Sequence, residues 1–201
     1  MNTVLICYPE LFKSYSKFER KVSNVLKNLN SFSILYINDP NQFIAEFANT
    51  NSYETEETSD WTLVLEKTTH AIIFDDGEEF PEVINTIKEK HLPMRIIKIK
   101  ITRVINIKKE LEYASQKSNP KYEYIGRGSY WGNPYSMYEK GEGRDEVIRK
   151  FKYDFDFNKF PYKDKSEVFK LVGKRLGCYC KPASCHGDVL ADFLNSWDDG
   201  K

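Results

Sequence analysis

The sequence lacks the long apolar run that a membrane-spanning helix needs. Its first eleven residues, MNTVLICYPEL, contain only a short apolar stretch, without the basic start or the small-residue cleavage site of a secretory signal peptide. These absences predict a cytoplasmic protein that has no membrane partner.

The sequence also has no excess of charge of either sign. Thirty Lys and Arg residues balance thirty Asp and Glu residues, so the formal net charge is zero. A neutral protein has no global field that would attract nucleic acid. We therefore expect a small-molecule ligand rather than a nucleic-acid partner, and the composition leaves a homo-oligomer open.

Cysteine and histidine are scarce, with four and three residues respectively, yet three of the cysteines fall within residues 173–197. Thiols stay reduced in the cytoplasm, which argues against a disulfide framework. The cluster therefore indicates chemistry, a metal site or simple burial, and it makes this stretch the first place to look for function.

The 201 residues are 40% hydrophobic and 14% aromatic, which is enough for an ordinary core. Apolar runs predict strands at 3–8, 32–37, 71–74 and 94–101, with amphipathic helical segments between them. This alternation predicts an α/β fold, a Rossmann-like parallel sheet flanked by helices. We expect residues 1–112 to form this domain and the polar residues 113–121 to be a linker. Residues 122–201 should form a smaller α/β domain that carries the site.

Residues 174–180 alternate with the period of a strand, which places Cys178 and Cys180 on one face. A helix should follow, with Ser184 as its N-cap and with Cys185, His186 and Asp188 in or beside its first turn. The backbone N–H groups at such a helix start favour a thiolate or a ligand phosphate.

Three interpretations of this cluster compete. Cys178, Cys180, Cys185 and His186 form a set of soft ligands that suits tetrahedral zinc, but adjacent Cys-His ligands strain a tetrahedron. Alternatively, Cys185 or Cys180 is a reactive thiol with a lowered pKa, or His186 and Asp188 act as acid and base. In the third interpretation the cysteines are small buried hydrophobes. We favour a non-metal site in which Cys178 is buried and Cys185 reacts with thiol probes at neutral pH.

Residues 124–134 read YIGRGSYWGNP and form a second polar cluster. Glycines let a loop approach a ligand closely, and Arg127 can bind phosphate through its planar fork. Trp131 offers a stacking face, while Ser129 and Asn133 can hydrogen-bond a sugar or base edge. The competing interpretation is a tight glycine turn with a core tryptophan, since Gly-Asn-Pro is also strong turn chemistry.

The N-terminal order of VLICYPELF, FSILYINDPNQFIAEFA and HAIIFDDGEEFPEVINTIKEK resembles the Rossmann-like nucleotide-binding superfamily of the lysine-decarboxylase-like phosphoribohydrolases. The resemblance implies the fold. In that superfamily, glycine-rich turns after the second and third strands approach phosphate. Here those turns read Asn38-Asp39-Pro40 and DDGEE at 75–79, with carboxylates that repel phosphate, so the phosphate site is not implied.

The C-terminal signatures GRGSYWGNP and GCYCKPASCHGDVLADFLN resemble the family called domain of unknown function 4326. The resemblance covers about the last 80 residues and implies that both motifs belong to one composite site. It implies no particular reaction.

Together these features predict an enzyme that acts on a nucleotide or a nucleotide-derived small molecule, by hydrolysis or transfer at an N-glycosidic or phosphate bond. The alternative is a non-catalytic module that sequesters a nucleotide signal or docks on a protein. We expect neither a cofactor nor a metal. The predicted catalytic residues are His186, Asp188 and Cys185, and the predicted ligand-binding residues are Arg127, Ser129, Trp131, Asn133 and Cys180.

Overall fold

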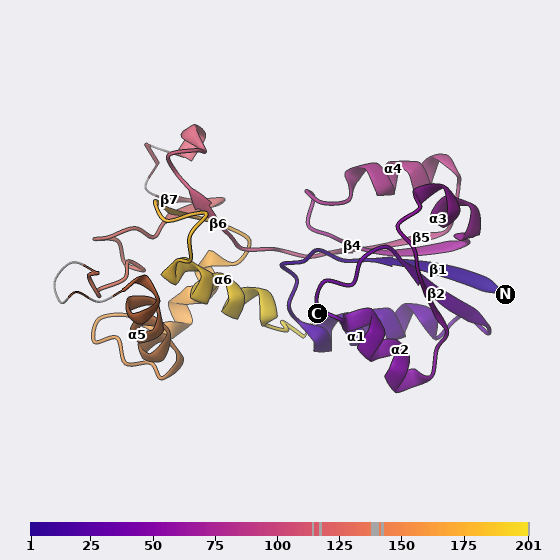
Figure 1. Cartoon of the computed structure of the whole chain (residues 1–201), viewed down its shortest axis with the longest axis horizontal. Helices are drawn as coiled ribbons and strands as arrows, with labels where there is room; N and C mark the ends of the chain where they lie inside the picture. Colours follow the sequence, from indigo (N-terminus) through magenta and orange to yellow (C-terminus); the bar gives the residue numbers. More distant parts are fainter. Residues whose placement is uncertain (114, 117, 138–140, 142, 201) are drawn as a thin grey trace. The chain divides into compact units, whose positions relative to one another are not determined.

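The computed structural model describes residues 1–113, 115–116, 118–137, 141 and 143–200. It divides the chain into two compact units (Figure 1). Unit 1 comprises Met1–Ile99 together with Ser196–Lys201, and unit 2 comprises Lys100–Asn195.

Unit 1 is built on a five-stranded sheet with the order β3-β2-β1-β4-β5, in which every neighbouring pair is parallel. Its strands are β1 (Asn2–Cys7), β2 (Phe32–Tyr36), β3 (Thr55–Glu57), β4 (His70–Asp75) and β5 (Met94–Lys98). The predicted α/β class is confirmed. The edge strand β3 is short, and all three of its residues are exposed.

Four helices cover this sheet, α1 (Tyr15–Leu26), α2 (Phe43–Asn51), α3 (Trp61–Lys67) and α4 (Pro81–Glu89). Helices α1 and α2 lie on one face, and α3 and α4 lie on the other (Figure 1). Both faces of the central strands are therefore covered, and Val4, Leu5 and Ile6 have no exposed surface. This is why β1 is an unbroken apolar run rather than an alternating one.

Unit 2 contains a second sheet with the order β6-β9-β8-β7. Its strands are β6 (Arg103–Asn106), β7 (Ser118–Asn119), β8 (Tyr122–Tyr124) and β9 (Arg175–Cys178). Strand β9 is parallel to both β6 and β8, whereas β7 and β8 are antiparallel. Strand β9, which carries the first cysteine of the cluster, is thus held on both sides.

One face of this second sheet is covered by α5 (Arg144–Asp156), the 3-10 segment η2 (Lys165–Leu171) and α6 (His186–Ser196). Their apolar side chains form a core that includes Phe151, Phe155 and Leu190 together with Leu176 of β9. On the other face, the ring of Tyr122 stacks on Tyr113 of the short η1 segment (Leu111–Tyr113), with 4.9 Å between centroids.

The division between the units differs from the predicted one. Unit 2 begins at Lys100 because β6 pairs with β9, so the boundary lies before the predicted linker at 113–121. Within that predicted linker, Ser118–Asn119 form strand β7, and residues 114 and 117 lie outside the described residues. The described residues of this polar segment therefore belong to unit 2 and do not form a linker between the units.

The end of the chain belongs to unit 1. Asp198 Oδ1 lies 2.6 Å from Arg20 Nη2, and Asp199 Oδ1 lies 2.7 Å from Lys17 Nζ, both on α1. None of the helices in the described part of the chain combines the length and the apolar character that a bilayer span requires.

Candidate functional site

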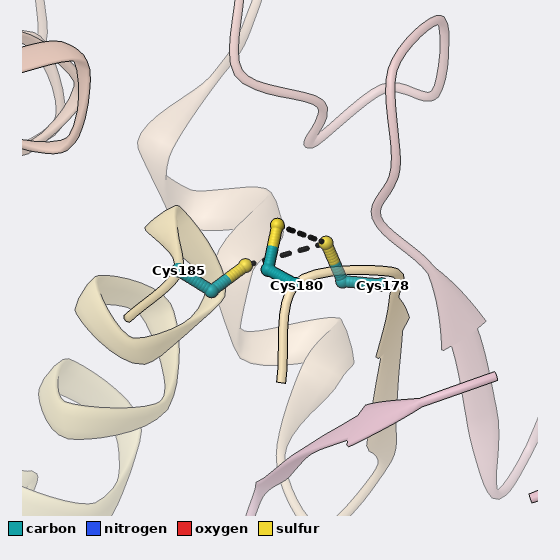
Figure 2. Close-up of side chains that lie close together, drawn as sticks. All are labelled: Cys178, Cys180 and Cys185. Atoms are coloured by element: carbon teal, nitrogen blue, oxygen red, sulfur yellow. Dashed lines mark hydrogen bonds between the residues drawn. The ribbon is translucent and has the colours of Figure 1, made fainter. Parts of the chain in front are cut away.

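Three cysteine side chains meet where β9 ends and α6 begins (Figure 2). The Sγ atom of Cys178 lies 3.3 Å from Cys180 Sγ and 3.3 Å from Cys185 Sγ. All three sulfurs lie within 4.8 Å of one another. The fourth cysteine, Cys7, is in strand β1 of unit 1.

A tight turn brings the third cysteine back to the first two. Strand β9 ends at Cys178, and the N–H of Ala183 donates to the carbonyl of Cys180 at 3.0 Å. The chain then reaches Cys185, which directly precedes α6. The spacing C-x-C-x4-C therefore converges although it departs from the usual metal-ligand pairs, because a turn separates the strand from the helix.

Cys185 and Asp188 together cap α6. Asp188 Oδ2 accepts from the N–H of Cys185 at 2.8 Å, and the N–H of Gly187 donates to Cys185 Sγ at 3.4 Å. This reciprocal arrangement resembles a capping box, with a thiol in place of the usual hydroxyl and with the N–H of Gly187, instead of that of Asp188, as its donor. The predicted N-cap, Ser184, is wrong by one residue, since the helix begins at His186.

His186 is buried beneath the cluster, with 6% of its surface exposed. Its Nε2 lies 2.9 Å from the carbonyl oxygen of Ile125, which can only accept, so Nε2 carries the proton. Its Nδ1 lies 3.6 Å from Cys185 Sγ. Burial lowers the pKa of His186, which keeps the ring neutral near neutral pH.

The pKa values of the three thiols shift in different directions. A hydrogen bond from Cys185 lowers the pKa of Cys178 to about 5, whereas the same contact, added to burial, raises the pKa of Cys185. Burial also raises the pKa of Cys180. Cys185, the thiol expected to react with probes at neutral pH, is only 1% exposed, and this burial disfavours that reaction.

The GRGSYWGNP motif forms two successive turns after β8. The N–H of Ser129 donates to Gly126 O, and the N–H of Gly132 donates to Ser129 O, both at 3.1 Å. A Cβ at Gly132 would lie 2.6 Å from the carbonyl oxygen of Gly126, so only glycine fits. Lys163 Nζ donates to Gly132 O at 3.0 Å and braces the loop from outside the motif.

The loop and the cysteine cluster line a common cavity of about 190 Å³. Predicted site residues that line it are Arg127, Asn133, Cys180, Cys185 and His186, together with Cys178. Helix α5 adds Arg144, whose Nη1 donates to the carbonyl of Ser184 at 3.0 Å. Arg144 was not among the predicted site residues, because it lies outside both sequence motifs.

Three predicted site residues do not reach this cavity. Trp131 is 4% exposed and packs edge-on against Phe155 at 6.2 Å between centroids, so it offers no stacking face. Ser129 lines a different hollow, and its Oγ is buried without a partner in the described part of the chain. Asp188 is held by Cys185 and by Lys181, whose Nζ lies 2.6 Å from Oδ1.

Asn133 lines the cavity, but its amide is already used by the fold. Its Nδ2 donates to the carbonyl of Val147 at 3.1 Å, and its Oδ1 accepts from the N–H of Tyr135 at 2.9 Å. These bonds fix the end of the loop to α5, so Asn133 shapes the cavity wall.

Comparison with known proteins places both parts of the chain. Residues 1–105, more than half of the 201, match the minimal SLOG domain. The chain belongs to the minimal SLOG domain family. SLOG domains are Rossmann-like and nucleotide-related, which confirms the N-terminal resemblance. Residues 105–196 match the domain of unknown function 4326, as the C-terminal signatures predicted.

One relative is described as an uncharacterized 12.4 kDa protein in the nrdA-td intergenic region of Enterobacteria phage T4. It is 43% identical over 72 residues, and the match covers 35% of this chain and 65% of the phage protein. The chain thus spans less than two thirds of that relative's length. No solved structure matches the chain.

In the SLOG unit, aspartate side chains accept hydrogen bonds from the backbone N–H groups that a phosphate would otherwise bind. Asp39 Oδ1 accepts from the N–H of Ile44 at 3.1 Å, and its Oδ2 accepts from the N–H of Ala45 at 2.8 Å, at the start of α2. Asp75 Oδ1 accepts from the N–H of Gly77 at 2.8 Å. A carboxylate built into the chain therefore fills the helix start that binds phosphate in related folds.

Proposed function

We propose that this protein is an enzyme that binds a phosphate-bearing, nucleotide-derived small molecule in the cavity of unit 2 and acts on its N-glycosidic or phosphate bond. The match to the SLOG domain supports a nucleotide-related function. The site is proposed in unit 2 because the strand ends of the SLOG unit carry carboxylates at the positions where phosphate would bind.

The observation that carries the proposal is Arg127. Its side chain is exposed, lines the cavity, and has no hydrogen-bond or ion-pair partner among the residues the structure describes. A guanidinium without such partners can donate two parallel N–H hydrogen bonds to a phosphate. Arg144 supplies a second positive charge to the same cavity wall.

The size of the cavity favours a small ligand or part of a larger one. Its volume of about 190 Å³ lies below the roughly 300–1,000 Å³ of pockets that enclose drug-sized molecules. A sugar phosphate, or the sugar-phosphate part of a nucleotide with its base outside, fits this description better than an enclosed dinucleotide.

The floor of the cavity holds the groups that can transfer protons. His186 is neutral, and its Nδ1 faces Cys185, so within this proposal it exchanges a proton with the thiols or with a ligand that reaches them. Asp188 acts as a positioning residue, because it holds the N–H of Cys185 and the ammonium of Lys181.

One observation favours a second candidate, a module that sequesters the ligand without turnover. Both oxygens of Asp188 and the Nε2 atom of His186 already have partners within the fold. The acid and base predicted from the sequence are therefore both engaged in holding the structure.

Binding is tested first, by thermal shift and calorimetry with nucleotides, sugar phosphates and inorganic phosphate. A ligand at 100 times its Kd should stabilise the protein by about 2.7 kcal/mol. Arg127→Ala should weaken binding at least tenfold. Arg149→Ala is the matched control, because Arg149 lies on α5 with its guanidinium 2.7 Å from Glu146 and outside the cavity lining. Equal affinities in the two variants would contradict the proposal.

Turnover separates the two candidates. After prolonged incubation with each ligand that binds, the enzyme should release a free base, a sugar phosphate or inorganic phosphate. His186→Asn should slow this release while leaving the Kd within a few fold. Recovery of unchanged ligand would instead favour sequestration.

A further inference from the structure

The three sulfurs at the start of α6 form a set of soft ligands whose atoms lie within 4.8 Å of one another. We infer that Cys178, Cys180 and Cys185 bind one zinc ion as thiolates, with the fourth coordination position turned toward the cavity. This inference rests on the sulfur geometry alone and stands independently of the ligand proposed for the cavity.

The spacing of the sulfurs is close to that of a metal centre. Zinc–sulfur bonds of about 2.3 Å at tetrahedral angles place sulfurs about 3.8 Å apart. Cys178 Sγ lies 3.3 Å from each of the other two sulfurs. Side-chain rotations that move each sulfur by a few tenths of an ångström would open the triangle to hold the ion.

Polar groups beside the sulfurs are of the kind that stabilises a metal thiolate. The N–H of Gly187 donates to Cys185 Sγ at 3.4 Å, and Arg144 lines the same cavity as the three sulfurs. Such outer contacts hold the ligands of metal sites in place. A zinc ion with three thiolates carries a net charge of minus one, which the guanidinium of Arg144 offsets.

The residue types select the metal. Thiolates favour zinc and other soft ions over magnesium and calcium, which take oxygen ligands. Three protein ligands and one open position are typical of zinc sites that act on a bound molecule rather than only stabilise a fold. All three cysteines line the cavity, and Cys180 is only partly buried, so the open position is accessible from there.

The expectation that the chain carries no metal rested on strain between adjacent Cys185 and His186 ligands. A three-sulfur centre does not require His186, so that objection does not apply to it. The Nε2–H of His186 donates to Ile125 O, which holds the ring beside Cys185 as a neighbour of the centre.

The first measurement is elemental analysis of the full chain purified under reducing conditions, with one equivalent of zinc expected. Cys178→Ser and Cys180→Ser should each lose about nine-tenths of this zinc. Cys7→Ser is the matched control, because Cys7 is a buried cysteine outside the cluster, and it should retain the full equivalent. Wild type free of zinc, or full zinc in both cluster variants, would overturn the inference.

A second measurement does not depend on the folding of variants. Wild-type protein stripped with a chelator is titrated with Co²⁺, and a thiolate-to-cobalt absorption band with the intensity of three sulfurs should reach its end point at one equivalent. Azide should shift the visible bands if the fourth position is open. An absent thiolate band would overturn the site, and bands that azide leaves unchanged would overturn the open position.

Two further measurements test the alternatives, which are a disulfide among the three cysteines and a zinc site with His186 as the fourth ligand. A native protein with a disulfide among these cysteines would show two free thiols after denaturation without reductant, instead of the expected four, and would contradict the zinc site. His186→Asn should retain the full equivalent of zinc. Loss of zinc from this variant, with its circular dichroism unchanged, would show that His186 is the fourth ligand and overturn the open position.

Discussion

The carboxylate of Asp188 joins the two sides of the turn that carries the cysteine cluster. Its Oδ2 accepts from the N–H of Cys185 at 2.8 Å, and its Oδ1 lies 2.6 Å from Lys181 Nζ. The position of Cys185 relative to Cys178 and Cys180 therefore depends on a residue that does not line the cavity.

Removing this carboxylate should loosen the start of α6. Asp188→Ala should lower the free energy of unfolding by about 1 kcal/mol, the usual cost of a lost helix cap. Asp188→Asn should cost less, because its amide oxygen can still accept from Cys185. Urea unfolding monitored by circular dichroism measures both values. Should Asp188→Asn abolish turnover at full stability, the catalytic role predicted from the sequence would be supported instead.

Gly177 is predicted to be intolerant of any side chain. A Cβ at this position in β9 would lie 2.2 Å from Tyr122 Oη, and the ring of Tyr122 is fully buried. Gly177→Ala should therefore destabilise the protein by about 2–3 kcal/mol, as overpacking of a core does. Gly143→Ala is the matched control, because none of the described residues has an atom within 4 Å of its added Cβ. Thermal unfolding of the two variants tests the difference, and equal melting temperatures would contradict it.

Asp39 should contribute to the stability of the SLOG unit. Its two oxygens accept from Ile44 N–H and Ala45 N–H, and Oδ1 also accepts from the hydroxyl of Tyr8. Asp39→Ala should cost about 1–2 kcal/mol, since it leaves backbone donors at the start of α2 without their acceptor. Asp39→Asn retains one acceptor oxygen, so its free energy of unfolding should lie between those of Asp39→Ala and wild type. A neutral effect of Asp39→Ala in urea unfolding would contradict this role.

Cys7 should make the stability of the protein sensitive to alkaline pH. Burial raises the pKa of its thiol to about 12, whereas a thiol in the unfolded chain ionises near about 8.5. The stability that the protonated Cys7 thiol contributes is therefore complete below the pKa of the unfolded chain. It is lost as the pH rises toward the pKa of the folded protein. Relative to Cys7→Ala, wild type should lose stability between about pH 8.5 and 12. The free energy of unfolding of both proteins, measured against pH, tests this prediction. Equal losses of stability in the two proteins over this range would contradict the raised pKa of Cys7.

The sequence by itself determined the fold class and indicated where the candidate site lies. Apolar runs such as VLIC at 4–7 form strands that are buried on both faces, so they can be recognised without knowledge of their neighbours. The two motifs of unit 2 also identified most of the cavity lining, because tight glycine turns and clustered thiols are local features.

The tertiary structure decided what each of these residues contacts. Periodicity could not distinguish a ligand-stacking Trp131 from a core one, because that depends on Phe155, 24 positions away in the printed sequence and edge-on to the indole. It could not place β6 beside β9 either, because strand pairing between residues about 70 positions apart leaves no local signal. The convergence of three sulfurs depends on a turn and a helix cap, and only the folded chain brings those contacts together.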